Sequence, residues 1–380
     1  MRNEVKLYFE ASSIVDNNKT GIGYFASNLI KSIYKNQKTI GFFFDLFGRN
    51  NYSLDDGLEK FSIKYIPAKL LSFIARTTGL QPPIELLIPN INKNDWIFYP
   101  NYISYPSIKK VRCIVTIHDL AYLDLPETVD DKNRMLLKKI VPKSIQRASI
   151  ILCISEFTKQ RLLHYFPDAK HKEILVLGIP PVINIKNSSS PMTILNKLGL
   201  QARNYMLSVG TIEPRKNIEQ AVDSYIMLKD SVRQNFKFVL LGRVGWKSDN
   251  VINKINNYNK NHPKNPIIVT GYVSDAEKNQ LYLNAKFFVL PSIYEGFGMP
   301  LLEAMVYRLP CIVNNIPVFH EIAGQSVEYY NSTKDLSDRM SSHINTRYKR
   351  VSYKKILSMY NWDIYAKNIL KSMKSYGSKV

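Results

Sequence analysis

Two carboxylates, Glu295 and Glu303, flank a glycine turn in the stretch "PSIYEGFGMPLLEAM", residues 291–305. An apolar run follows at once, and Pro300 is preorganised for the first turn of a helix. The free N–H groups at a helix start favour an anion, and glycines let a ligand approach the backbone closely. Carboxylates are poor neighbours for phosphates but good acceptors for hydroxyl groups. The stretch therefore predicts a site where backbone groups bind an anion while acids bind hydroxyls.

Cationic side chains lie on two other predicted loops. Arg215 and Lys216 follow an apolar run in "SVGTIEPRKN" (208–217), and Arg243 follows another in "LLGRVGW" (240–246). If the three loops lie on one edge of a sheet, the cations suit a diphosphate and the acids suit the hydroxyls of ribose and of a second sugar. Glu303 is expected within the first turn of its helix, where the helix dipole would stabilise its charge. Taken singly, a Glu at a helix start usually only stabilises the helix dipole, and "PRK" is usually a solvated loop. Only the combination of these cations and acids predicts a binding site for a nucleotide sugar.

Short apolar, β-rich runs alternate with helical patterns along the whole chain. Such runs indicate parallel strands covered by helices on both faces. The predicted strands are 5–11, 41–47, 95–100, 112–119, 148–155, 173–178, 204–210, 236–242, 266–271, 285–292, 310–315 and 327–330. The predicted helices include 23–35, 132–146, 156–165, 217–229, 248–260, 274–284 and 300–308. Ser274 and Glu277 predict a capping box at one helix start. The pattern predicts an α/β fold with two doubly wound parallel sheets, joined by the polar linker "NIKNSSSPM", residues 184–192.

The length and charge of the chain bound its class. Its 380 residues are enough for two cores, and 52 Lys and Arg against 31 Asp and Glu give a net charge of +21. A basic surface attracts nucleic acid, anionic lipid or phosphorylated substrates, but a bias toward Lys at solvated positions would give the same charge. The cations are scattered and form no nucleic-acid motif. We therefore expect no nucleic-acid partner.

The sequence also bears on the compartment. No apolar run is long enough to span a membrane. Glu4 and Lys6 fall where a signal peptide would have its apolar core, so we expect a cytoplasmic protein. Cys113, Cys153 and Cys311 are far apart in the sequence. They are interpreted as buried thiols rather than as metal ligands or disulfide partners.

The motifs together resemble the retaining glycosyltransferases of the GT-B fold, in glycosyltransferase family 4. That family has two glutamates separated by seven residues, as in "EGFGMPLLE" (295–303). "VGTIEPRKN" (209–217) resembles the phosphate loop of its mannosyltransferase-like branch. "TIHDLAYLDLPE" (116–127) resembles a first-domain loop whose His lies beside the donor sugar. "TGIGYFASNL" (20–29) resembles a first-domain glycine loop near the donor diphosphate.

The resemblance implies a domain organisation. An N-terminal Rossmann-like domain on the acceptor side (1–183) and a C-terminal nucleotide-sugar domain (193–359) would face a central cleft. The last segment, 360–380, would form a helix that packs back on the first domain, although an ordinary terminal helix would have the same pattern.

The resemblance also implies roles for single residues. Glu295 would bind hydroxyls of the transferred sugar, Lys216 would neutralise the diphosphate, and His118 would contact the sugar or the reaction centre. A His at this position can also merely cap a backbone group, and Asp119 is expected to orient the loop. Thr211 stands where the family often has Arg, so another arginine would supply that charge. The donor-binding residues are expected to be Gly21, Gly23, Thr211, Arg215, Lys216, Arg243, Glu295, Gly296, Phe297, Gly298 and Glu303, with Glu303 on the ribose.

The implied reaction is transfer of a hexose with retention of configuration, by attack on the face that the phosphate leaves. The sequence has no Asp-x-Asp pair, so we expect no metal and no other cofactor, with Lys216 and backbone dipoles meeting the leaving-group charge. GDP-mannose is the first donor expected, and the acceptor would be a glycan or lipid-linked saccharide in surface polysaccharide assembly. The basic surface, including 135–147, fits contact with an anionic membrane at its inner face. Glu295→Ala should remove activity at an unchanged melting temperature, because a loop acid contributes little to the core.

Several alternatives remain open at this stage. "GIGYFA" (21–26) followed by Asp45 resembles a dinucleotide-binding turn, but residues 12–20 separate it from the preceding strand. Basicity alone would suit a nucleic-acid-binding protein. A nucleotide-sugar epimerase or a glycogen-type synthase shares the expected architecture. A catalytically inactive scaffold is disfavoured because the three expected catalytic residues are present.

Overall fold

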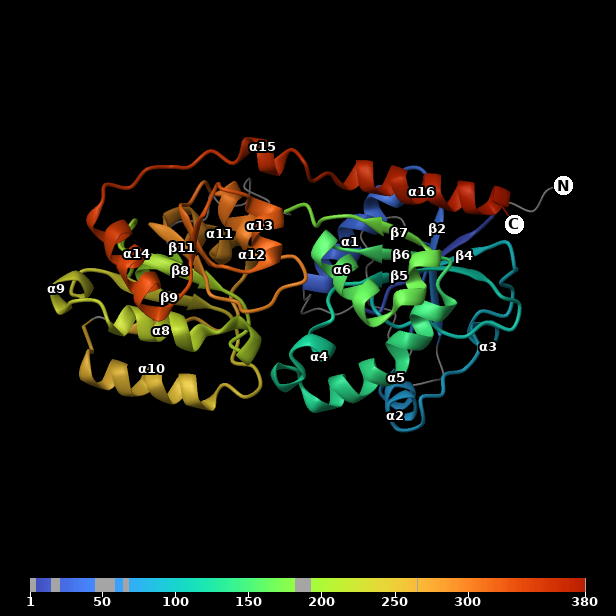
Figure 1. Cartoon of the computed structure of the whole chain (residues 1–380), viewed down its shortest axis with the longest axis horizontal. Helices are drawn as coiled ribbons and strands as arrows, with labels where there is room; N and C mark the ends of the chain where they lie inside the picture. Colours follow the sequence, from blue (N-terminus) through green and yellow to red (C-terminus); the bar gives the residue numbers. More distant parts are fainter. Residues whose placement is uncertain are drawn as a thin grey trace. The chain divides into compact units, whose positions relative to one another are not determined.

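The computed structural model describes residues 5–14, 21–44, 59–63, 68–181, 193–264 and 266–379. The chain divides into two compact units, one formed by Met1–Ile179 with Asn361–Val380 and the other by Pro180–Tyr360 (Figure 1). The C-terminal segment therefore belongs to the same unit as the N-terminus. The expected linker, 184–192, and Asp45 lie outside the described residues.

The first unit contains a parallel sheet of seven strands in the order β3-β2-β1-β4-β5-β6-β7. The strands are β1 (Leu7–Glu10), β2 (Thr39–Phe44), β3 (Glu59–Ile63), β4 (Trp96–Tyr99), β5 (Arg112–Ile117), β6 (Ile150–Cys153) and β7 (Glu173–Val176). The helices are α1 (Gly21–Tyr34), α2 (Ala68–Thr78), α3 (Ile84–Leu87), α4 (Ala121–Asp124), α5 (Asp131–Arg147), α6 (Glu156–Tyr165) and α16 (Trp362–Lys379). The strand order reverses at β1, which pairs with both β2 and β4.

Strand side chains alternate between the two faces of this sheet. On one face Tyr99 and Val115 belong to a buried cluster that includes Val141 of α5. On the other face the rings of Phe9 and Phe98 stack with centroids 5.1 Å apart. Burial of both faces explains why these strands are apolar throughout.

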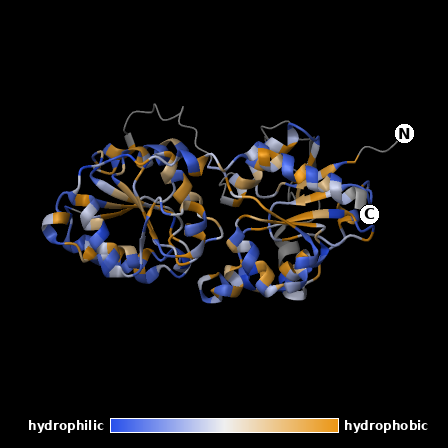
Figure 2. Ribbon diagram, turned by 45° about the horizontal axis from the view of Figure 1, so that its top comes forward, coloured by the Kyte–Doolittle hydropathy of each residue, from blue (hydrophilic) through white to orange (hydrophobic). Residues whose placement is uncertain are grey.

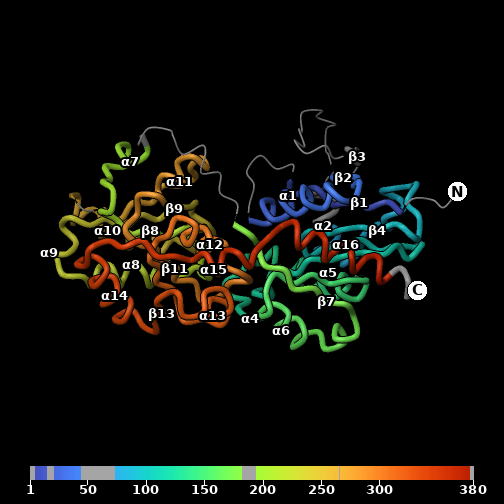
Figure 3. The backbone as a smooth tube through the Cα atoms, turned by 90° about the horizontal axis from the view of Figure 1, so that it is seen from above, coloured from blue at the N-terminus to red at the C-terminus, as the bar shows by residue number. Residues whose placement is uncertain are grey.

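The C-terminal helix covers part of the second face. α16 lies beside α1 (Figure 3), and its Trp362 packs on Phe25 of α1 with ring centroids 5.8 Å apart. Near the other end of α16, Tyr376 contacts Trp96 of β4 at 5.7 Å. Ile369, between them, is fully buried. The last helix is thus part of the core of the first unit.

The second unit contains a parallel sheet of six strands in the order β10-β9-β8-β11-β12-β13. The strands are β8 (Tyr205–Val209), β9 (Lys237–Leu241), β10 (Ile267–Val269), β11 (Phe287–Leu290), β12 (Cys311–Asn314) and β13 (Glu328–Tyr330). The helices are α7 (Thr193–Lys197), α8 (Ile218–Ile226), α9 (Asp230–Arg233), α10 (Asp249–Asn261), α11 (Asp275–Asn284), α12 (Met299–Val306), α13 (Pro317–Ala323), α14 (Thr333–Asn345) and α15 (Lys354–Leu357). Here the strand order reverses at β8, which pairs with β9 and β11.

Helices cover both faces of the second sheet. Buried residues of α8, α10 and α14 form one cluster with the strands. α11, α12 and α13 lie on the opposite face (Figure 1). Hydropathy follows this layering, since the strands of both units are mostly hydrophobic, whereas the helices mix hydrophilic and hydrophobic residues (Figure 2). The expected α/β fold with two doubly wound parallel sheets is confirmed.

The predicted strands are present with small differences at their ends, and the capping box on α11 is confirmed. The Ser274 hydroxyl accepts from the Glu277 N–H at 3.3 Å, and the Glu277 carboxylate accepts from the Ser274 N–H at 2.9 Å. The three cysteines are buried free thiols, as expected. β3 and the helices α2, α3, α4, α7, α9, α13, α14 and α15 are absent from the predicted elements. None of the described helices has both the length and the apolar character of a membrane span.

Candidate active site

The loops that follow β8 and β11 meet at the carboxyl edge of the second sheet. The Ile293 N–H donates to the Arg215 carbonyl at 3.0 Å, which joins the two loops directly. These strands are neighbours at the point where the strand order reverses, and ligands of doubly wound sheets bind beyond the carboxyl ends of such strands. The local topology therefore marks this edge as the first place to look for a site.

Glycines bring the ends of β8 and β9 close together. The N–H groups of Gly210 and Ile212 donate to Leu241 and Arg243 carbonyls, each at 2.9 Å. Gly242 has φ +155°, and a Cβ there would lie 2.0 Å from the Gly210 carbonyl oxygen. Only glycine fits this contact. The close approach fixes the loop that carries Lys216.

An ion-pair cluster joins the two loops. Lys216 Nζ lies 2.5 Å from Glu295 Oε1, and Arg215 lies 3.5 Å from Glu295 Oε2. Arg215 also pairs with Glu213 at 3.0 Å, and the Ser292 hydroxyl donates to Glu295 at 2.8 Å. The cluster thus has two cations and two carboxylates, and the structure brings together the Lys and the first Glu that the sequence predicts as catalytic.

Glu295 is a buried anion. Its residue is 5% exposed, and burial alone would raise the pKa of its carboxyl group. Lys216, Arg215 and the Ser292 hydroxyl outweigh burial, so the net effect lowers the pKa. Glu295 is therefore ionised at neutral pH and can accept hydrogen bonds from hydroxyls.

Glu303 occupies a different environment from the one expected. α12 begins at Met299, so Glu303 is its fifth residue. The helix dipole acts most strongly within the first turn, and Glu303 lies beyond that turn. Its carboxylate instead accepts from the Tyr282 hydroxyl at 2.8 Å and pairs with Lys278 at 3.1 Å. Burial, followed by the charge of Glu303, raises the pKa of Tyr282 well above its ordinary value, so Tyr282 remains a donor. The expected stabilisation by the first helical turn is wrong, and two side chains of α11 replace it.

The remaining predicted residues of the second unit lie around the same loops. Thr211 is partly exposed directly after Gly210, and Arg243 is exposed and forms no ion pair with a described residue. The ring of Phe297 is buried and contacts Tyr360 with centroids 5.4 Å apart. A donor contact at Phe297 would therefore have to use its backbone.

The glycines of the β11 loop have different surroundings. Gly296 is buried in the loop. Gly298 has φ +105°, and a Cβ there would lie 2.9 Å from the Phe319 ring. Glycine at position 298 lets α12 begin directly after the loop.

His118 lies at the carboxyl edge of the first sheet, after β5. Its Nε2 is 2.7 Å from the Pro100 carbonyl, and its ring packs against Phe25 at 5.1 Å and Tyr102 at 5.7 Å. A carbonyl oxygen only accepts, so Nε2 carries the proton and Nδ1 is the acceptor of the neutral ring. Burial lowers the pKa of His118 despite Pro100 and Asp119, which favours the neutral form.

Two further expectations concern the same edge. The Asp119 carboxylate accepts from the Ala121 N–H at 3.2 Å, a hydrogen bond within the loop that leads into α4. Gly21 and Gly23 were expected in a loop but are the first and third residues of α1. Because α1 already begins at Gly21, the backbone N–H groups of both glycines belong to the start of a helix and not to a loop.

Four supporting residues were not predicted from the sequence. They are Glu213, Ser292, Lys278 and Tyr282. Lys278 and Tyr282 are four positions apart and so share one face of α11. That spacing is visible in the sequence, but the neighbour of that face is not. Within the part of the chain that the structure describes, no group of three His, Cys, Asp or Glu residues is placed to hold a metal ion.

Comparison with known proteins adds independent findings. Residues 193–356 match the family described as "Glycosyl transferases group 1". The chain is 28% identical over 266 residues to O-antigen chain mannosyltransferase B of Escherichia coli, covering 68% of each chain. It is 29% identical over 192 residues to the serotype-specific mannosyltransferase WbdA of Escherichia coli, which covers 49% of this chain and 23% of that protein's length.

Solved structures agree with the fold. The structure of Anabaena Alr3699/HepE in complex with UDP and glucose superposes with a TM-score of 0.66 at 13% identity, covering 98% of this chain and 100% of that chain. At this identity the likeness supports the fold alone, which is GT-B. Residues 193–356 are similar to a glycosyl transferases group 1 domain, and these matches together indicate that the chain is a glycosyltransferase.

Proposed function

We propose that the enzyme transfers a hexose, mannose from GDP-mannose, to a glycan or lipid-linked saccharide in surface polysaccharide assembly. We further propose that transfer retains the anomeric configuration and needs no metal ion, as expected of family 4. The observation that carries this proposal is the ion-pair cluster of Lys216, Arg215 and the buried Glu295 at the edge where the strand order reverses. The mannosyltransferases among its relatives favour mannose as the sugar.

The cluster can exchange its internal pairs for substrate contacts. A diphosphate would take Lys216 and Arg215 as cationic partners, and the sugar hydroxyls would donate to Glu295. Glu213 would remain on Arg215 and keep its guanidinium oriented. Lys216 keeps an anionic partner in this exchange, because the incoming diphosphate replaces the carboxylate beside it. Preorganised cations of this kind stabilise the charge that develops on a leaving phosphate.

Glu303 is proposed to accept from the ribose hydroxyls. Each of its carboxylate oxygens already has one donor, Tyr282 or Lys278, and each can accept a second hydrogen bond. These donors hold the carboxylate in one orientation. Arg243, with no ion pair to a described residue, is a proposed further partner of the phosphates.

His118 is proposed to contact the transferred sugar through Nδ1, since Nε2 is bonded to Pro100. In the proposed reaction the bond from the anomeric carbon to the phosphate oxygen breaks while the acceptor oxygen attacks from the same face. The departing phosphate takes the acceptor's proton, so no carboxylate need act as a base. Two acids in the site do not make a hydrolase pair, because Glu303 contacts α11 and Glu295 contacts the β8 loop.

Contact with an anionic membrane is proposed for the first unit. Phe73, in the middle of α2, is 54% exposed, Leu80, just after α2, is 65% exposed, and Leu86 on α3 is 71% exposed. Lys132 and Lys138 of the adjacent α5 are exposed cations. Exposed apolar side chains beside exposed cations suit the interface of an anionic bilayer. This surface would place the enzyme at the cytoplasmic face of the membrane, beside a lipid-linked acceptor.

A screen of nucleotide sugars tests the donor proposal. Thermal stabilisation by GDP-mannose should exceed that by UDP-glucose, GDP-glucose and UDP-N-acetylglucosamine, since a ligand that binds only the folded protein raises its melting temperature. UDP-glucose is the main competitor, because HepE was solved with UDP and glucose. NMR of the product should show the anomeric configuration of the donor, with EDTA present throughout. Inversion, or activity lost in EDTA, would contradict the proposed mechanism.

A further inference from the structure

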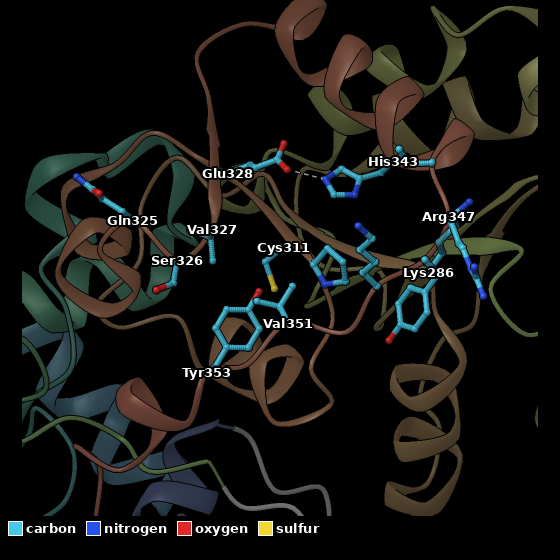
Figure 4. A pocket seen from close by; sticks show the side chains of 14 residues that line it. Lys286, Cys311, Gln325, Ser326, Val327, Glu328, His343, Arg347, Val351 and Tyr353 are labelled. Atoms are coloured by element: carbon cyan, nitrogen blue, oxygen red, sulfur yellow. Dashed lines mark hydrogen bonds and ion pairs between the residues drawn. The ribbon is translucent and has the colours of Figure 1, made fainter.

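A cavity lies at the amino edge of the second sheet, on the side away from the candidate active site. It has a volume of about 380 Å³ and is lined by residues that precede β11, β12 and β13, among them Lys286, Pro310 and Val327 (Figure 4). In a parallel sheet all amino ends lie on one edge, so this cavity is opposite the edge that carries Lys216 and Glu295. Its volume is within the range of small-molecule sites, from about 300 Å³ upward.

Cations dominate the charged groups of this cavity. Lys286, Arg347 and Lys349 line it, against one carboxylate, Glu328. The Glu328 carboxylate already has partners, because it pairs with His343 at 2.9 Å and with Arg339 at 3.4 Å. The field inside the cavity is therefore positive.

The structure explains only one of these cations by internal contacts. Lys286 Nζ donates to the Ile344 carbonyl at 2.6 Å, in the last turn of α14, where a cation stabilises the helix end. Arg347 and Lys349 are exposed and form no ion pair with a described residue. Burial lowers the pKa of Lys286, a shift that a bound anion would oppose.

The segment that carries these cations is held firmly. The Val351 N–H donates to the Arg308 carbonyl at 3.0 Å, and the Tyr353 hydroxyl donates to the Leu309 carbonyl at 2.9 Å. Arg203 lies 4.0 Å from the ring centroid of Tyr348. The cations therefore project from a fixed backbone, so less conformational entropy is lost on binding.

Apolar side chains complete the wall. Val327, Val351 and the buried Tyr353 line the cavity beside the cations. A ligand that fits needs one strongly anionic group and a compact body with some apolar surface. Phosphate esters meet both conditions, and Arg suits them because its guanidinium can bind two oxygens at once.

We propose that this cavity binds a small phosphorylated molecule, at a site separate from the donor site. Arg347 and Lys349 would hold the phosphate, with Lys286 as a third cation. The proposal does not depend on the donor assignment, because it uses different residues on the opposite edge of the sheet.

Pyrophosphate is the probe for the test. Isothermal titration of the full chain should show two sites in the wild type, of which Lys216→Ala removes one. The double variant Arg347→Glu/Lys349→Glu should weaken the other by about tenfold or more, since both contacts are charge-assisted. Lys260→Glu, a charge reversal of an exposed lysine on α10, should leave both sites unchanged.

A second measurement reports on the cavity itself. The side-chain NMR signals of His343 should shift on addition of pyrophosphate in the wild type and equally in Lys216→Ala. The proposal is overturned if the double variant binds like the wild type, or if the His343 signals do not move. The proposal would also be overturned if the full chain bound vesicles of anionic phospholipid through Arg347 and Lys349 but did not bind free pyrophosphate there.

Discussion

Glu295 has little access to water and yet carries a full charge. Its burial would favour the neutral acid, but Lys216, Arg215 and Ser292 hold its pKa below the ordinary value. Removing one partner of a buried pair leaves the other charge uncompensated, which is more damaging than the loss of an exposed pair. The residue therefore has both a structural and a proposed catalytic role.

Glu295→Ala should lower kcat/KM by about a hundredfold or more, since it removes a preorganised contact to the sugar. It should also lower the free energy of unfolding by about 2 kcal/mol, because Lys216 loses its buried partner. The sequence alone predicts an unchanged melting temperature, and the burial of Glu295 revises that expectation. Steady-state kinetics and urea unfolding measure both effects. The exposed Glu219→Ala serves as control, and wild-type activity in Glu295→Ala would refute the role.

His118 should titrate below its ordinary pKa of 6.5, because burial disfavours its charged form. The unfolded chain then binds more protons than the folded protein, so the free energy of unfolding falls as the pH drops through 6.5 toward the folded pKa. NMR titration of the ring, assigned with His118→Gln, gives the midpoint. Urea unfolding at pH 7.5 and 5.5 should show a smaller pH dependence in His118→Gln. A midpoint at or above 6.5 would contradict the assignment.

At the scale of elements, the site depends on how closely two strand ends approach. The backbone at Gly242, directly after β9, lies very close to the backbone at Gly210, directly after β8, and this contact sets the course of the loop that carries Arg215 and Lys216. The β11 loop then reaches the same point through its hydrogen bond to Arg215. The positions of the charged groups are consequences of this backbone geometry.

Gly242→Ala should therefore lower both stability and activity. Its Cβ would meet the Gly210 carbonyl at 2.0 Å, so the strand ends must separate. Gly271→Ala is a matched control, because Gly271 also has a positive φ, +69°, but no atom within 4 Å of a Cβ. The control should lose about 1 kcal/mol from backbone strain alone. Gly242→Ala should lose clearly more, together with most of its activity; equal losses in urea unfolding would show that the close approach is unimportant.

At the scale of the whole molecule, the chain leaves the first unit and returns to it. α16 completes a core that begins with β1 and α1, so segments far apart in the sequence build the first unit together. The fold of the first unit thus depends on contacts between the two ends of the chain.

Ile369→Ala should destabilise the first unit by about 2–4 kcal/mol, the usual loss for a fully buried aliphatic side chain. Ile364→Ala, on the same helix but 53% exposed, should change stability little. Hydrogen exchange read by mass spectrometry should show faster exchange in β1 and α1 of Ile369→Ala, with α8 and α12 unchanged. Equal exchange in the two variants would mean that α16 does not stabilise this unit.

The fold was largely readable from the sequence because buried parallel strands are continuous apolar runs, such as Phe287–Leu290. β3 was missed because "EKFSI" mixes charged and apolar residues. The motif residues of the site were found, but their partners were not. Glu295 meets Lys216 only because β8 and β11 are neighbours, and the strand order is set by tertiary packing rather than by local sequence. The burial of the Phe297 ring could not be predicted either, because Tyr360, which it contacts, is distant in the sequence.

The central claim is that Lys216 and its neighbours bind the diphosphate of a nucleotide sugar. Isothermal titration of GDP-mannose into the wild type, Lys216→Ala and the control Lys260→Ala tests it most directly. The wild type and the control should bind GDP-mannose tightly, and Lys216→Ala should bind it about tenfold or more weakly, since a charge-assisted contact is lost. Equal affinity for GDP-mannose in all three proteins would contradict it.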